Sequence, residues 1–226
     1  MKITFLGQNG FLIESKKSTI IIDPYLSDSV EKTEPKNRRR QPIDERFFKI
    51  KPDIVLITHA HADHYDEETL DRFLKGNDGC VLFAPPSVFL SAKKRYPCCD
   101  CVFFRPGTSY TKGDILLRAV AAEHSDPEAV GAILSCEGKN LYITGDTLYS
   151  ERVFDSLPAE KIDALFLPIN GKGNNMNATD AARFARRIGA ENVVPVHFGL
   201  FDELTGDELQ CDNKIIPEIY KEIVLK

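Results

Sequence analysis

The five histidines of this 226-residue chain are the side chains best suited to chemistry. Three of them, His59, His61 and His64, stand within seven residues of one another, and His124 and His197 each follow a separate apolar segment far downstream. The neutral histidine ring is a common metal ligand at ordinary pH. The pattern therefore predicts a metal site, and we interpret the chain as a metalloenzyme.

Six apolar runs of the sequence end at polar residues of the kind that metal sites use. The runs Thr19–Ile22, Ile54–Thr58, Leu116–Glu123, Leu141–Gly145, Leu165–Ile169 and Val193–Val196 are followed by Asp23, His59, His124, Asp146, Asn170 and His197, respectively. Sheet proteins carry functional groups on the loops beyond strand ends, where a rigid scaffold holds them. If these strands share one edge, the six side chains converge on one site.

A first metal ion would use three of the histidines. His59 and His61 are two residues apart at a strand exit, so both rings can turn toward one ion, and His124 would complete the set. Nitrogen and oxygen ligands with an open coordination position indicate a catalytic site rather than a closed structural zinc site. Such ligands serve zinc, manganese and iron alike, so the spacing leaves the identity of the metal open.

A second metal ion would lie close to the first. Asp63 and His64 begin the next helix, and His197 would complete their set. Asp146 has two carboxylate oxygens and is the natural bridge between two ions that lie about 3.5–4 Å apart in such enzymes. Asp63 is also placed to handle the proton that moves to the leaving group, whereas Asp23 would orient the histidine loop without binding metal.

Hydrophobic periodicity and turn residues predict the elements that position these groups. Strands are expected at Lys2–Leu6, Phe11–Glu14, Thr19–Ile22, Ile54–Thr58, Val81–Ala84, Val102–Arg105, Ile115–Ala122, Ala132–Cys136, Leu141–Thr144, Ala164–Ile169 and Val193–Val196. Helices are expected at Asp66–Leu74, Ser87–Arg95, Glu151–Leu157, Ala178–Ile188 and Ile215–Ile223. Asp66 and Asn177 are the expected N-caps, and Gly189 should end its helix. Ser27–Glu45 should form a long exposed loop.

The order of these elements predicts the architecture. A β-meander followed by α/β alternation suggests two sheets packed face to face with helices outside, which is an α/β four-layer αββα sandwich. Hydrophobic residues make up 42% of the chain, so a large core is available. The length suits one domain, and we interpret residues 1–226 as a single domain.

Composition narrows the classes of partner. The formal net charge is −5 with acidic and basic residues interspersed, so no nucleic-acid partner is expected. No apolar stretch approaches membrane-spanning length and no secretory leader is visible, so we expect a soluble cytoplasmic protein without a membrane partner. The six cysteines are irregularly placed and need not form disulfides. The sequence leaves the oligomeric state open, and a homo-oligomer is one possibility.

The motifs resemble those of the metallo-β-lactamase superfamily. The run His59-Ala60-His61-Ala62-Asp63-His64, the later His124, Gly145-Asp146-Thr147 and His197 carry the resemblance, which covers nearly the whole chain from Asp23-Pro24 onward. Leu167-Pro168-Ile169-Asn170-Gly171, Asn175-Met176-Asn177, Ala181-Ala182 and Pro195-Val196-His197-Phe198-Gly199 are similar to the L-ascorbate-6-phosphate lactonase group and its short metal-dependent hydrolase relatives. The resemblance implies an αββα fold, a metal-bound hydroxide nucleophile and, for the lactonase itself, manganese.

Several residues are weaker candidates for substrate contact. Asn170 and Lys172 lie at the expected edge of the site. Arg38, Arg39 and Arg40 in the long loop could clamp a phosphate or carboxylate, although a solvated loop is the favoured interpretation of this run. The segment Cys98–Cys101 contains a Cys-x-x-Cys that could bind metal or undergo redox chemistry. No second cysteine pair accompanies it, which favours a simple turn between helix and strand.

The leading hypothesis is a hydrolase that opens a small anionic ester or lactone, such as a sugar-acid phosphate lactone. It would use two divalent metal ions, either zinc or manganese, with iron as a further option. A phosphodiesterase or nuclease of the same superfamily is the main alternative, although the chain shows no broad basic surface. A non-catalytic metal-binding regulatory protein is a further alternative from another class. A redox di-iron role is disfavoured because such relatives carry Glu where this chain has His61.

Overall fold

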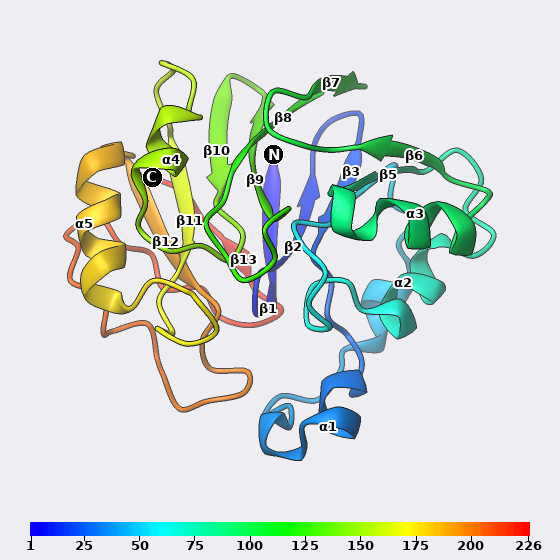
Figure 1. The fold of residues 1–226 in the computed structure, drawn as a ribbon, viewed down its shortest axis with the longest axis horizontal. Helices are drawn as coiled ribbons and strands as arrows, with labels where there is room; N and C mark the ends of the chain where they lie inside the picture. The colour runs from blue at the N-terminus through cyan, green and yellow to red at the C-terminus, as the bar shows by residue number, and fades with distance from the viewer.

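The computed structural model, which describes residues 1–226, consists of two β-sheets packed face to face with helices on both outer sides (Figure 1). Helices α2 (Glu67–Leu74) and α3 (Pro86–Arg95) cover one sheet, and helices α4 (Glu151–Asp155) and α5 (Ala178–Ile188) cover the other. The αββα sandwich predicted from the order of the elements is therefore confirmed.

The first sheet has seven strands and is mixed. Its order is β13-β1-β2-β3-β4-β5-β6, formed by β1 (Lys2–Gly7), β2 (Gly10–Glu14), β3 (Thr19–Ile22), β4 (Ile54–Leu56), β5 (Val81–Ala84), β6 (Asp100–Phe103) and β13 (Glu222–Ile223). The meander β1–β2–β3 is antiparallel, and β3, β4, β5 and β6 run parallel. Parallel strands end at the same edge of a sheet, so the exits of β3 and β4 are neighbours.

The second sheet has six strands in the order β12-β11-β10-β9-β8-β7. These are β7 (Ser109–Lys112), β8 (Ile115–Ala121), β9 (Val130–Cys136), β10 (Lys139–Ile143), β11 (Ala164–Pro168) and β12 (Asn192–Val196). Strands β10, β11 and β12 are parallel to one another. Strand β8 shares their direction, because β9 is antiparallel to both β8 and β10. Four chain exits therefore lie at one edge of this sheet.

The core consists of three apolar layers that alternate with the sheets and helices. A cluster of 25 buried residues fills the space between the two sheets, and clusters of 17 residues each seat the helices on either outer side. The side chains of strand β3 contribute to two of these layers. Ile20 and Ile22 point between the sheets while Ile21 points toward the helices, because successive side chains of a strand face opposite sides.

The helix ends follow the predicted capping chemistry. The side chain of Asp66 accepts a hydrogen bond from the backbone N–H of Thr69 at the start of α2, and Asn177 accepts one from Asp180 at the start of α5. Gly189 ends α5 in the left-handed region, with φ 68°, where glycine has no Cβ penalty. These local signals were readable in the sequence because they depend on residues three or four positions apart.

The predicted closing helix at Ile215–Ile223 is wrong. This segment is irregular and ends in the short strand β13. The backbone N–H of Ile215 donates to the carbonyl of Val193 in the second sheet, and that of Tyr220 donates to Phe5 in the first sheet. The segment thus makes its backbone hydrogen bonds to the two sheets. In addition, Pro217 lacks the N–H that a helix interior would require.

The segment Ser27–Glu45 is not a continuous loop as predicted. It contains helix α1 (Ser29–Thr33) and the 3-10 turn η1 (Pro35–Asn37), and a second 3-10 turn, η2 (Glu45–Lys49), begins at its end. Helix α1 projects beyond the edge of the sandwich (Figure 1). Strand β7 was not predicted, and β6 begins two residues before the expected Val102. None of the helices combines the length and hydropathy that a membrane span requires.

Candidate metal centre

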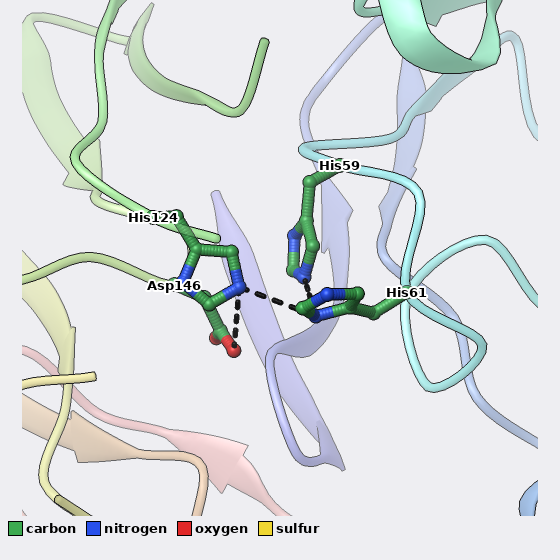
Figure 2. A group of neighbouring side chains, drawn as sticks. All are labelled: His59, His61, His124 and Asp146. Atoms are coloured by element: carbon green, nitrogen blue, oxygen red, sulfur yellow. Dashed lines mark hydrogen bonds and ion pairs between the residues drawn. The ribbon is translucent and has the colours of Figure 1, made fainter. Parts of the chain in front are cut away.

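Three histidine rings from two sheets face one another at the open edge of the sandwich (Figure 2). Nε2 of His59 lies 3.0 Å from Nδ1 of His61, which in turn lies 3.2 Å from Nε2 of His124. His59 and His61 follow β4, and His124 follows β8. Ring nitrogens at this spacing suit a shared cation, because zinc–nitrogen bonds of about 2.0–2.1 Å place tetrahedral ligands a little over 3 Å apart.

A second group of ligand atoms lies beside the first. Nε2 of His197 is 3.4 Å from a carboxylate oxygen of Asp63, and Nε2 of His64 is 3.8 Å from the same oxygen. The ring of His64 also lies against that of His59, with centroids 3.9 Å apart. The two groups of side chains thus adjoin each other where the ring of His64 meets that of His59.

Asp146 faces both groups. Its Oδ1 is 3.5 Å from Nε2 of His64, and its Oδ2 is 3.2 Å from Nε2 of His197 and 3.9 Å from Nε2 of His124. Figure 2 shows the carboxylate below the ring of His124. Asp146 follows β10, in the same turn as Gly145. A Cβ on Gly145 would lie 2.9 Å from the carbonyl oxygen of Val130, so only glycine fits this close approach.

Each of the five histidine rings has one nitrogen turned outward to a polar partner. The partners are the hydroxyls of Thr58 and Ser125 for His59 and His61, Asp23 for His64, the carbonyl of Asn174 for His124 and the amide of Asn170 for His197. The opposite nitrogen of each ring faces the cluster. Histidines that bind metals are held in this way, since the outer partner fixes the ring's orientation and tautomer.

Asp23 holds the exit of β4 through its carboxylate. It is fully buried, and its Oδ1 accepts a hydrogen bond of 2.8 Å from the backbone N–H of Thr58. Its Oδ2 accepts from the Thr58 hydroxyl at 2.5 Å and lies 2.8 Å from Nδ1 of His64. One carboxylate therefore fixes both the strand exit that carries His59 and the ring of His64.

Left-handed backbone conformations gather around the cluster. Gln8, Asp23, Asn174 and His197 have φ values of 50°, 40°, 62° and 57°, in a region that residues other than glycine rarely adopt. Such strain persists where the surroundings impose it, and it is typical of functional sites. At His197 the backbone N–H donates to the carbonyl of Gln8 at 2.8 Å, which ties β12 to the turn after β1.

The cluster concentrates opposite charges in a dry environment. Burial and the neighbouring His64 ring lower the pKa of His59 well below its usual value. Burial alone would also lower the pKa of His197, but the carboxylates of Asp146 and Asp63 outweigh it and raise the pKa to about 10. Burial would raise the pKa of Asp146, yet the His197 and His64 rings hold it well below the usual range. The carboxylates are therefore ionised ligands at neutral pH.

The donor set fits one or two divalent cations. Nε2 of His64 is buried and has no hydrogen-bond partner, although Nδ1 of the same ring is fixed on Asp23. A buried nitrogen without a partner is costly unless a ligand satisfies it. Groups of mutually close ligand atoms are formed by His59, His61, His124 and Asp146, and by Asp63, His64 and His197. A cation in each group would satisfy the inward-facing nitrogens.

Comparison with known proteins identifies the family. The family described as Beta-lactamase superfamily domain matches residues 2–197. The chain belongs to this superfamily. It is 29% identical to the UPF0173 metal-dependent hydrolase of Oenococcus oeni over 98% of this chain and 99% of that protein, and 31% identical to a UPF0173 protein of Pyrococcus furiosus over 93% and 89%. The crystal structure of an isothiocyanate hydrolase from Delia radicum gut bacteria shares the fold, with a TM-score of 0.77, 18% identity and coverage of 100% and 99%.

A cavity of about 700 Å³ opens over the cluster of this superfamily member. His61, Asp63, Asp146 and His197 line its floor, and Asn170 and Lys172, both predicted to lie near the site, line its wall. The opposite wall comes from the segment around α1 and η1, including Lys36 and Asn37. Both Lys36 and Lys172 are exposed side chains with no ion-pair partner, so they present free positive charge to the cavity.

Arg39 and Arg40 do not line this cavity, which corrects their prediction as substrate contacts. The guanidinium of Arg39 is buried and donates to the carbonyl of Tyr25 at 2.8 Å and to the hydroxyl of Tyr220 at 2.7 Å. Arg40 instead pairs with Glu203, at 3.4 Å. Arg38 approaches Glu31 at 3.8 Å. Arg39 therefore anchors the segment that carries α1, whereas Arg38 and Arg40 make only exposed ion pairs.

The Cys98–Cys101 segment runs from the turn after α3 into the start of β6, in keeping with the simpler interpretation as a connection between helix and strand. Its cysteines are free, and Sγ of Cys98 lies 4.0 Å from Sγ of Cys99. None of these sulfurs belongs to a group of mutually close metal ligands. The segment has no part in the metal centre of this protein.

Three amide side chains of the site were not predicted. Asn9 and Asn175 each donate to one oxygen of Asp146, at 2.6 and 2.8 Å, and Gln8 donates to Asp63 at 2.9 Å. These amides fix the direction of the two carboxylates. Gln8 and Asn9 occupy the turn between β1 and β2, which a turn-forming composition explains without any function. Asn175 lay in a run noted only for its family resemblance.

Proposed function

We propose that this protein is a metal-dependent hydrolase that uses two divalent cations to cleave a small anionic ester or lactone, for which a sugar-acid phosphate lactone is one candidate. The observation that carries the proposal is the placement of Asp146, whose Oδ2 lies 3.2 Å from Nε2 of His197 in one group of ligand atoms and 3.9 Å from Nε2 of His124 in the adjoining group. Relatives that share nearly the full length of the chain are named metal-dependent hydrolases, which supports the reaction class.

The proposal divides the side chains between two ions. His59, His61 and His124 would hold one ion, and Asp63, His64 and His197 would hold the other. Asp146 would bridge them. Bound pairs of divalent ions lower the pKa of water from about 15.7 toward about 7 and so supply hydroxide at neutral pH. Zinc and manganese suit this set of nitrogen and oxygen donors, and so does iron.

Asp63 is the residue that we assign to proton movement. It lines the cavity, and the amide of Gln8 holds its Oδ2 at 2.9 Å while leaving Oδ1 without a neighbouring donor. The pKa of Asp63 lies below its usual value, because the His64 and His197 rings outweigh the effect of burial. Asp63 is therefore ionised at neutral pH, and it is its place in the lining of the cavity that suits it to pass a proton from the attacking water to the leaving oxygen.

The walls of the cavity support a small anionic substrate. The volume of about 700 Å³ lies within the range of about 300–1000 Å³ typical of small-molecule sites. Lys36 and Lys172 supply positive charge from opposite walls, and the two acids of the lining outside the metal centre are turned to neutral donors: Glu34 accepts from Asn37, and Asp202 accepts from the backbone of Gly199 and Leu204. Asn170, which touches His197, is the side chain best placed to orient a carbonyl.

Metal analysis together with a substrate panel tests the proposal. The panel contains a lactone with and without a phosphate group, a carboxylate-bearing aryl ester, an aryl phosphodiester and, because a structural neighbour carries that name, an isothiocyanate. We expect two metal equivalents per chain and turnover of the anionic lactone or ester. Turnover of the phosphodiester alone would favour the nuclease alternative. A chain that binds metal and turns over none of the probes would favour a regulatory role.

A further inference from the structure

Asp126 is a buried carboxylate close to the metal centre that the proposed mechanism does not use. It lies in the loop between β8 and β9, two residues after His124, and is 9% exposed. Its Oδ2 accepts a hydrogen bond from the backbone N–H of Ala60 at 3.0 Å and another from the hydroxyl of Ser87 at 2.7 Å. Its Oδ1 accepts from the backbone N–H of Glu128 at 2.9 Å.

The hydrogen bond between Asp126 and Ala60 connects the two sheets at the strand ends that carry the metal-binding histidines. Ala60 stands between His59 and His61, which follow a strand of the first sheet, whereas Asp126 belongs to a loop of the second sheet. A parallel contact lies on the other side of His59, where the backbone N–H of Val130 donates to the carbonyl of Thr58 at 3.0 Å. The backbone on either side of His59 is therefore held by the β8–β9 loop and by the first residue of β9.

The same loop carries His124, so Asp126 fixes the relative position of the three rings. Asp23 holds Thr58 just before the two rings, and the carbonyl of His61 accepts backbone hydrogen bonds just after them, so the bond to Asp126 is the contact that fixes the backbone between His59 and His61. A charged acceptor makes a stronger hydrogen bond than a neutral one. Asp63, His64 and His197 are held instead by Gln8, Asp23 and Asn170, on the other side of the cluster.

We propose that Asp126 is a positioning residue that sets the site of one metal ion and not of the other. It holds His59 and His61 against His124, and its loss should weaken the ion bound by these three rings while the ion bound by Asp63, His64 and His197 stays in place. The proposal rests on the two-metal function proposed above. Partners outside the ligand set typically contribute about 10- to 100-fold in metal affinity.

Metal titration of full-length variants tests this assignment. Metal-free wild type, Asp126→Ala and Asp126→Asn are titrated with zinc in competition with a chromophoric chelator. Wild type should bind two equivalents. Asp126→Ala should keep one equivalent at the affinity of wild type and bind the other about 10- to 100-fold more weakly. Asp126→Asn keeps a carbonyl acceptor of the same shape, so its loss of metal affinity should be smaller. This variant replaces Asp126→Ala in the titration if the alanine variant does not fold.

Asp163→Ala is the matched control. Asp163 is 8% exposed and accepts a backbone hydrogen bond from Asn140 at 2.7 Å, but it lies before β11, at the opposite edge of the sheet. We expect this variant to keep both equivalents whatever it loses in stability. Equal weakening of both ions in Asp126→Ala, or no weakening of either, would overturn the positioning role.

A crystal structure of Asp126→Ala separates this proposal from the function on which it rests. The spacing of 3.2 Å between the rings of His61 and His124 should widen, while the 3.4 Å between His197 and Asp63 should persist. If wild type bound fewer than two equivalents, the two-metal function would be contradicted, yet the change in ring spacing would still decide the role of Asp126. Unchanged rings in the variant would exclude that role.

Discussion

Asp146 is the single side chain on which both proposed ions depend. Its oxygens lie 3.5 Å from His64, 3.2 Å from His197 and 3.9 Å from His124. Asp146→Ala should therefore lose affinity for both ions and reduce hydrolysis by more than the roughly 100-fold that partners outside the ligand set contribute. Metal content and the far-ultraviolet circular dichroism spectrum check this. Two tightly bound ions in a folded Asp146→Ala variant would contradict the bridging role.

Lys172 tests whether the cavity selects anions. A hydrogen bond to a charged group is worth about 1.5–3 kcal/mol, so Lys172→Gln should lower kcat/KM for a carboxylate-bearing ester by about 10- to 100-fold. The neutral ester of the same alcohol should be hydrolysed at the rate of wild type. Lys94→Gln, which changes an exposed lysine of α3 outside the cavity, is the control. Equal losses for both esters would remove charge recognition from the role of Lys172.

The segment that carries α1 forms one wall of the cavity and is held by a buried arginine. Arg39 contacts the carbonyl of Tyr25 and the hydroxyl of Tyr220, and it lies over the ring of Tyr25 at 5.3 Å. Beneath α1, Val30 packs with Tyr25 and Leu200 in a small separate cluster. This wall thus depends on a few contacts with the main body of the sandwich.

Arg39→Ala should destabilise the protein without removing its metals. Loss of the two hydrogen bonds leaves buried acceptors unpaired, at a cost of about 1–3 kcal/mol in the free energy of unfolding. Arg38→Ala, which removes an exposed neighbour 3.8 Å from Glu31, should change this free energy by less than about 0.5 kcal/mol. Urea unfolding measures both. An Arg39→Ala variant of normal stability that discriminates poorly between anionic and neutral esters would restore the substrate-binding interpretation.

Strands and helices with strong local signals could be predicted from the sequence, and the exceptions have physical causes. The central strands are continuous apolar runs, such as Thr19–Ile22, because both of their faces are buried. Strand β7 reads Ser-Tyr-Thr-Lys and lies at an edge, where burial imposes no apolar pattern. The segment Ile215–Ile223 has helix-like apolar spacing, yet its hydrogen bonds go to distant strands, which no local pattern reveals.

In the candidate site, too, some residues could be predicted from the sequence and others could not. Residues that end apolar strands, such as His59 and Asp146, could be placed because the topology brings strand exits to one edge. The supporting groups could not be placed, because their partners are remote in sequence: Asn9 is 137 positions from Asp146, and Asp126 is 66 positions from Ala60. Amides and single carboxylates occur in every loop, so their spacing carries no signal of its own.

The most direct test of the whole account is a crystal structure of the metal-loaded protein with anomalous scattering from the bound ions. We expect two anomalous peaks about 3.5–4 Å apart. One peak should lie among His59, His61 and His124, the other among Asp63, His64 and His197, with Asp146 between them. A single peak, or ions bound outside these groups, would contradict the two-metal centre.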